Sequence, residues 1–94
     1  MTPKSINYSR LPEHIRGGAQ RYIENGIRPG DFQQAVISNK LKESFFSADE
    51  INQERMLDII LFWYNEAPGP CWGSPEKMET WIEAGGWYGE KKPS

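Results

Sequence analysis

The chain has 94 residues, which suits one small domain. Its formal net charge of −2 argues against nucleic acid as a partner, because sequence-independent binding needs a basic surface. With one cysteine, Cys71, and one histidine, His14, we expect no intramolecular disulfide, no metal site and no cofactor. Hydrophobic residues make up 37% and aromatic residues 13%, so we expect a thin core of large side chains, or one that a second subunit completes.

The sequence predicts neither a membrane span nor a signal peptide. The longest apolar run covers residues 59–64, well short of the ~20 residues that a spanning helix needs. The first ten residues are polar and lack the apolar segment of a signal peptide. We therefore expect a cytoplasmic protein with no membrane partner.

The first predicted helix covers residues 12–25. Pro12 suits its first turn because the missing N–H needs no partner there, and Gly26 is a natural left-handed cap. Gly17-Gly18 either weakens this helix or allows another backbone to approach closely. Apolar side chains recur every three or four residues on one face: Leu11, Ile15, Ala19, Tyr22 and Ile23.

A second helix is predicted to begin at Asp31, which forms a capping-box pattern with Gln34. Two apolar rows then follow each other out of phase: Phe32, Ala35 and Val36, and after them Ile37, Leu41 and Phe45. The change of phase at Ser38-Asn39 indicates either one kinked helix or two short helices, the second capped at Asn39.

The third predicted helix, over residues 48–66, is the longest and most apolar, and we expect it to be central. Ser47 and Glu50 form a capping-box pattern at its start, and Pro68 ends it. Its apolar stripe is Ile51, Met56, Ile59, Ile60 and Trp63, widened by Leu57, Leu61 and Tyr64.

A fourth helix is predicted between a cap at Ser74 and a stop at Gly85-Gly86. Its apolar face is Met78, Trp81 and Ile82. No segment shows the alternation of a strand, so the predicted class is all-α, a compact bundle of four to five short helices. We expect a flexible arm over residues 1–10, one helical domain over 11–88 and a disordered tail over 89–94.

No catalytic motif is present, so we do not expect an enzyme. His14 lacks a nucleophile pattern and is interpreted as a surface histidine near a helix start. Cys71 stands between Pro70 and Trp72 and is interpreted as a packing residue. The acidic residues of the middle segment are interpreted as solvated faces and caps rather than as a mimic of nucleic acid: Glu43, Asp49, Glu50, Glu54 and Asp58.

Basic and aromatic residues supply the candidate ligand-binding set. Arginine binds phosphate with a planar fork, aromatic rings stack on bases, and a helix start offers free N–H groups beside ordinary capping. We expect Trp63 and Trp81 to be core residues, and leave open whether Trp87 and Tyr88 are core or contact a partner. The set is Arg16, Arg21, Tyr22, Arg28, Trp72, Ser74, Trp87 and Tyr88.

Four blocks of sequence carry a family resemblance: LPEHIRGG at residues 11–18, RYIENGIRPGDF at 21–32, YNEAP at 64–68 and WGSPE at 72–76. Across residues 11–88 the chain resembles a group of small accessory proteins encoded by bacteriophages and prophages. The resemblance carries no established activity. It implies an accessory protein that acts in the cytoplasm of the bacterial host.

From this resemblance and the aromatic excess we expect a binding protein. The leading hypothesis is a homo-oligomer that counteracts anti-phage defence by sequestering a nucleotide-like signal molecule where subunits meet. One alternative is an inhibitor that binds a host or defence complex directly, for example a CRISPR-type complex. The third is a structural or oligomeric accessory protein.

Overall fold

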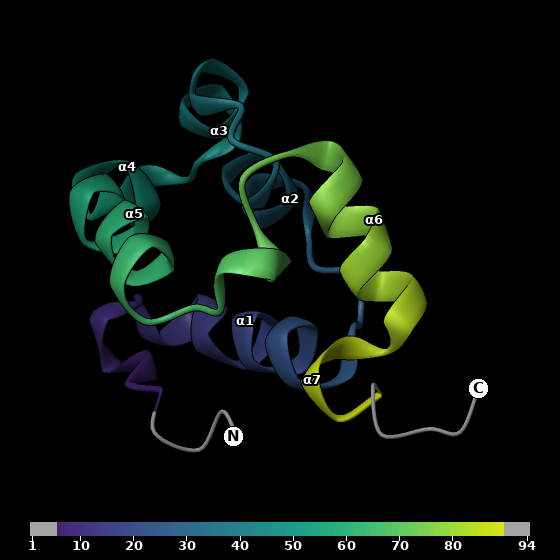
Figure 1. Ribbon diagram of the computed structural model, residues 1–94. Coiled ribbons are helices and arrows are strands. Elements are labelled where there is room, and N and C mark those ends of the chain that lie inside the picture. Colours follow the sequence, from purple (N-terminus) through teal and green to yellow (C-terminus); the bar gives the residue numbers. More distant parts are fainter. Residues whose placement is uncertain (1–5, 90–94) are drawn as a thin grey trace.

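All regular secondary structure in the described part of the chain is helical. The computed structural model describes residues 6–89 and contains no strand in that range. Figure 1 shows the helices arranged around a short connection, η3. The expected all-α class is confirmed, with more and shorter elements than predicted: η2 (Tyr8–Arg10), α1 (Glu13–Asn25), α2 (Asp31–Ile37), α3 (Leu41–Ser47), α4 (Glu50–Glu54), α5 (Met56–Asn65), η3 (Gly69–Cys71), α6 (Pro75–Ala84) and α7 (Gly86–Gly89).

Helix α1 begins and ends where the sequence predicts. Pro12 is its N-cap, and Gly26 is its C-cap with a left-handed φ of 70°. The Tyr22 hydroxyl donates to the backbone oxygen of Cys71 at 2.5 Å, which ties α1 to η3. The apolar face is buried over its whole length: Leu11, Ile15, Ala19, Tyr22 and Ile23.

Two backbones do approach closely, but at α7 rather than at Gly17-Gly18. Gly17 and Gly18 instead give room to the side chains of Arg21 and Gln33. Gly26 and Gly86 both have positive φ, and a Cβ at Gly26 would lie 2.6 Å from the Gly86 nitrogen. Since only glycine tolerates both conditions, these residues fix the packing of α7 against the end of α1 (Figure 1).

The second predicted helix is two short helices. Helix α2 ends at Ile37 and α3 begins at Leu41, while Asn39 between them has φ of 63°. Asparagine tolerates this left-handed conformation better than most residues, so the change of phase marks a true break. The N-cap of α3 is Lys40 and not Asn39.

Both capping boxes predicted in the middle of the chain are wrong in detail. The N-cap of α2 is Gly30, so Asp31 is already the first helical residue. Asp49, and not Ser47, caps α4 by accepting a hydrogen bond from the Asn52 N–H at 2.8 Å. The Ser47 hydroxyl instead donates to a carbonyl inside α3, the competing bond that serine readily forms.

The predicted central helix is interrupted at Arg55, which separates α4 from α5. Only α5 supplies core residues, namely Ile59, Phe62 and Trp63. The break changes the phase of the apolar stripe, so Ile51 on α4 is 54% exposed.

Much of the apolar surface predicted to face inward therefore faces outward. Helix α3 turns Ser44 toward the interior instead of its apolar row, and Leu41 is 55% exposed. The large exposed side chains of α3 to α5 are Leu41, Phe45, Phe46, Ile51, Leu57 and Tyr64.

Helix α6 agrees with its prediction. The Ser74 hydroxyl accepts from the Lys77 N–H at 3.1 Å, and Gly85 ends the helix in a left-handed conformation. Met78 and Trp81 are buried in the core, against which Ile82 packs.

The ends of the chain are described only in part. Residues 1–5 of the predicted arm and 90–94 of the predicted tail lie outside the described residues. In the second half of the arm, η2 places the Tyr8 ring 5.5 Å from that of Phe62. Within residues 6–89, no helix is long and apolar enough to cross a bilayer.

Candidate functional site

The structure does not bring the predicted arginine cluster together as a phosphate site. Arg16 donates to the backbone oxygens of Leu11 at 2.8 Å and Ser9 at 3.2 Å. Arg28 forms a two-pronged ion pair with Glu79, at 2.8 and 2.7 Å. This pair lowers the pKa of the Glu79 carboxyl, mainly through the hydrogen bond to the guanidinium. Both guanidinium groups therefore already have hydrogen-bond partners within the chain.

The predicted aromatic residues are likewise dispersed. Tyr22 is fully buried and cannot stack on a ligand. Trp87 packs against Trp81 at the edge of the core, with ring centroids 6.2 Å apart. Of the two alternatives left open for Trp87, this packing favours the core over contact with a partner. Tyr88 is 41% exposed, which leaves it available to a partner.

Trp72 lies in a separate region, where its ring is 5.0 Å from that of Tyr64. Ser74 is engaged in capping α6, the simpler of its two interpretations. The eight predicted residues therefore do not form one site.

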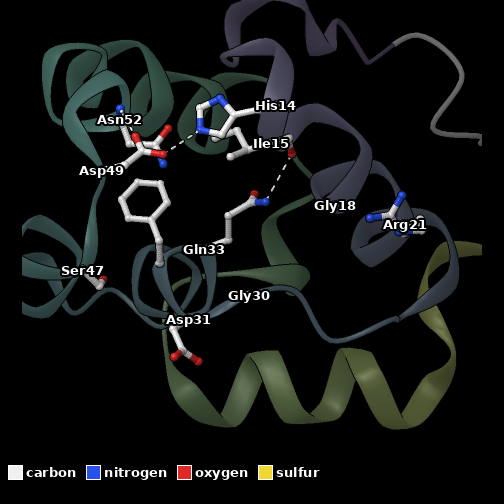
Figure 2. Close-up of a pocket in the computed structure, with 11 residues that line it drawn as sticks. His14, Ile15, Gly18, Arg21, Gly30, Asp31, Gln33, Ser47, Asp49 and Asn52 are labelled. Carbon is white, nitrogen blue, oxygen red and sulfur yellow. Dashed lines mark hydrogen bonds and ion pairs between the residues drawn. The ribbon is translucent and has the colours of Figure 1, made fainter.

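A polar cleft lies between α1, the start of α2 and α4 (Figure 2). Its volume is about 370 Å³. Figure 2 shows His14 and Asp49 pointing toward one another and Gln33 reaching toward α1, while Arg21 and Asp31 lie at the edges. The lining residues are His14, Ile15, Gly18, Arg21, Gly30, Asp31, Phe32, Gln33, Ser47, Asp49 and Asn52.

His14 and Asp49 close one side of this cleft. The Nε2 atom of His14 lies 3.0 Å from Oδ2 of Asp49. The other carboxylate oxygen, Oδ1, accepts the Asn52 N–H at the start of α4. The hydrogen bond from the Asn52 N–H lowers the pKa of the Asp49 carboxyl below its ordinary value, and the hydrogen bond with His14 lowers this pKa further. The cap of α4 thus also fixes a carboxylate beside the cleft.

Two amide side chains give the cleft an unusual chemistry. Gln33 is 5% exposed and Asn52 is 3% exposed. Gln33 donates from Nε2 to the Ile15 backbone oxygen at 3.2 Å, yet its Oε1 atom has no hydrogen-bond partner among residues 6–89. Oδ1 of Asn52 is also buried without a partner in this range. A buried acceptor left unsatisfied costs about 1–3 kcal/mol, so each of these oxygens needs an explanation.

The part of the cleft lining that the structure describes contains one hydroxyl and several hydrogen-bond acceptors. Among the described residues, Ser47 is the one hydroxyl that lines it, but this hydroxyl donates to the Glu43 carbonyl at 2.8 Å and not to His14. The cleft instead offers hydrogen-bond acceptors on Gln33, Asn52 and Asp49. Within residues 6–89 there is no group of three or more His, Cys, Asp or Glu side chains that could hold a metal ion.

A second, apolar groove lies between α3 and α5. Its volume is about 140 Å³, and the Tyr64 and Trp72 rings form part of its wall. Trp63 also lines it, and the indole N–H of Trp63 is buried without an acceptor. The full lining is Val36, Asn39, Leu41, Ile60, Trp63, Tyr64 and Trp72.

Cys71 is a core residue, as predicted. It is fully buried, and burial raises the pKa of its thiol to about 12. Since the thiolate is the reactive form, Cys71 belongs to the packing of η3.

Sequence reasoning missed Gln33 and Asn52. Gln33 lies in a short helix whose other buried residues are apolar. Asn52 is the one buried residue of α4, and Ile51 beside it is exposed. No sequence motif marks either residue.

The protein is all-α within residues 6–89 and has a polar cleft between α1, the start of α2 and α4. Comparison of the chain with protein-family models, with curated proteins and with solved structures finds no match. The resemblance to phage accessory proteins therefore stays a prediction.

Proposed function

We propose that this protein is a non-enzymatic accessory protein of phage type that sequesters a nucleotide-like small molecule in the cleft between α1, α2 and α4. One observation carries the proposal: Oε1 of Gln33 and Oδ1 of Asn52 are buried beside the cleft without partners. A ligand that donates hydrogen bonds would satisfy both oxygens, and its binding would repay their desolvation.

The chemistry of the cleft favours the base of such a ligand over its phosphates. Amide and carboxylate oxygens accept hydrogen bonds from the exocyclic amino and ring N–H groups of nucleobases. Phe32 adds an aromatic side chain to the lining. We infer that the donor edge of a base enters the cleft.

The charge of the cleft sets a limit on the ligand. Among the described lining residues, Arg21 is the only permanently charged cation. The same lining includes two carboxylates, those of Asp31 and Asp49. The Arg21 guanidinium lies beside Gly17 at the edge. It is suited to one phosphate, so we expect nucleosides or singly phosphorylated nucleotides to bind more tightly than cyclic dinucleotides.

Isothermal titration calorimetry with nucleosides, nucleoside monophosphates, ADP-ribose and cyclic dinucleotides tests this proposal. We expect micromolar or tighter binding by one of the first two classes. Gln33→Met removes an acceptor and should weaken this binding about tenfold, the equivalent of 1.4 kcal/mol. Gln34→Met is the matched control, because this neighbouring glutamine does not line the cleft. Absence of binding by every compound would overturn the proposal, as would equal binding by both variants.

The direct inhibitor of a host or defence complex is the second candidate. The apolar side chains exposed on α3 favour it. A plaque assay in bacteria that carry a defence system separates the two functions. Sequestration predicts that Gln33→Met reduces the protein's ability to protect the phage from the defence system and that Phe46→Ser retains this ability. Direct inhibition predicts the reverse.

A further inference from the structure

Helix α3 stands out from the rest of the molecule. Figure 1 shows it at the outer end of the fold, and α2 is the one element with which it makes extensive contact. It has seven residues, too few to be stable by itself in water. Its buried residue is Ser44, while Phe46 is 77% exposed. The helix therefore presents apolar side chains to solvent and a polar one to the interior.

The apolar groove continues this surface onto α5. Leu41 belongs both to α3 and to the groove, and Phe45 follows it one helical turn later. On α5, Leu57, Ile60 and Tyr64 recur at helical spacing, and Leu57 and Tyr64 are exposed. The outer faces of α3 and α5 thus form one apolar surface around the groove.

We propose that this surface is the interface of a homodimer, in which α3 of one copy packs against the groove of the other. The large exposed side chains of this surface are Leu41, Phe45, Phe46, Leu57 and Tyr64. A large side chain that is half to three-quarters exposed has on the order of 100 Å² of solvent-accessible surface. Five such side chains supply roughly 500 Å². Together with the groove walls, this approaches the ~800 Å² that each partner buries in a stable interface.

Two further features fit a second copy as the occupant. Helix α3 carries the exposed Phe45 and Phe46 and, at Leu41, part of the groove wall. A two-fold interface requires such proximity, since each copy must offer what the other accepts. Helix α3 also carries Lys42 and Glu43, and its N-cap is Lys40. All three are exposed, so a second copy meets charges of both signs instead of a single repelling sign.

The groove also contains an incomplete hydrogen bond. The buried N–H of Trp63 has no acceptor among the described residues. The volume of the groove, about 140 Å³, is close to that of a cavity that holds one benzene ring. A phenylalanine ring from the second copy fits this space, and the accompanying backbone supplies carbonyl acceptors.

Sedimentation velocity of the full chain over a range of concentrations tests the proposal. The expected species has about twice the 10.8 kDa mass of the chain. Phe46→Ser should weaken the dimer at least tenfold and leave the circular dichroism of each chain unchanged, because this side chain is exposed within one chain. Ile27→Ser is the matched control, since Ile27 is 51% exposed in the turn after α1, away from the surface described above, and this variant should dimerise like the wild type.

A wild-type chain that stays monomeric up to about 1 mM would overturn the proposal. So would a dimer that Phe46→Ser and Ile27→Ser weaken equally, because the interface would then lie elsewhere. Gln33→Met should not affect dimerisation, so failure of the ligand proposal and failure of the dimer proposal are distinguishable.

Discussion

The part of the molecule built from α1, η3, α6 and α7 is closed, whereas the part built from α3, α4 and α5 is open. In the closed part, backbones touch at Gly26 and Gly86, and the indole N–H of Trp81 donates to the carbonyls of Tyr22 and Ile23 at 3.1 Å. In the open part, apolar side chains are exposed, and the buried Trp63 N–H and Asn52 Oδ1 have no partner within the described part of the chain. The open part is also the richer of the two in aromatic and aliphatic residues, so it holds more apolar side chains than it buries.

The difference matters for the proposed ligand and for the proposed dimer, since Asn52 and the outer faces of α3 and α5 all lie in the open part. A chain of this size has little stability to lose, so it satisfies its polar groups wherever it can. Unsatisfied groups and exposed apolar side chains that gather in one part are therefore the reason for proposing contacts with other molecules there.

The largest effect is expected at the glycine contact of the closed part. A Cβ at Gly86, where φ is 78°, would lie 2.5 Å from the backbone nitrogen of Asn25. Gly86→Ala should lower the free energy of unfolding by at least about 3 kcal/mol, because backbone strain and a backbone clash combine. Urea denaturation followed by circular dichroism measures the change.

Gly30→Ala is the control for this prediction. A Cβ at Gly30 meets nothing within 4 Å, and its φ of −68° suits any residue. Its effect should stay within about 0.5 kcal/mol. Equal effects of the two substitutions would show that α7 is not held against α1.

Two isoleucines of the open part compare a buried position with an exposed one in the same substitution. Ile59 on α5 is fully buried, and Ile51 on α4 is half exposed. Ile59→Ala should lower the free energy of unfolding by about 2–4 kcal/mol, since it leaves a cavity, and Ile51→Ala by less than about 1 kcal/mol. The same denaturation experiment decides. A larger loss for Ile51→Ala would mean that α4 is packed more tightly than described.

The elements whose ends are set by local chemistry could be predicted from the sequence. Pro12, Gly26, Ser74 and Gly85 act on their own neighbours, so α1 and α6 agree with their predictions. The break at Arg55 carries no glycine or proline, and no local rule predicts it. It follows from tertiary packing, and it moves Ile51 from the expected core to the surface.

The ligand site was less predictable than the fold. Arg16 and Arg28 suit phosphate by residue type. In the structure, however, Arg16 donates to the backbone oxygen of Ser9 and Arg28 pairs with Glu79 on α6. The cleft depends on Gln33 and Asn52, which carry no motif. Their importance comes from burial without a partner, a property that exists only in three dimensions.

The most direct test of the cleft as a ligand site is the free energy of unfolding of Asn52→Leu, measured with and without the best ligand from the calorimetric panel. Leucine has nearly the same shape but no buried oxygen, so the variant should be about 1 kcal/mol more stable than the wild type without ligand. It should gain little further stability from the ligand. Asn65→Leu, at an exposed position on α5, is the control and should keep the full effect of the ligand. A less stable Asn52→Leu protein that the ligand still stabilises as it does the wild type would contradict a binding role for this oxygen.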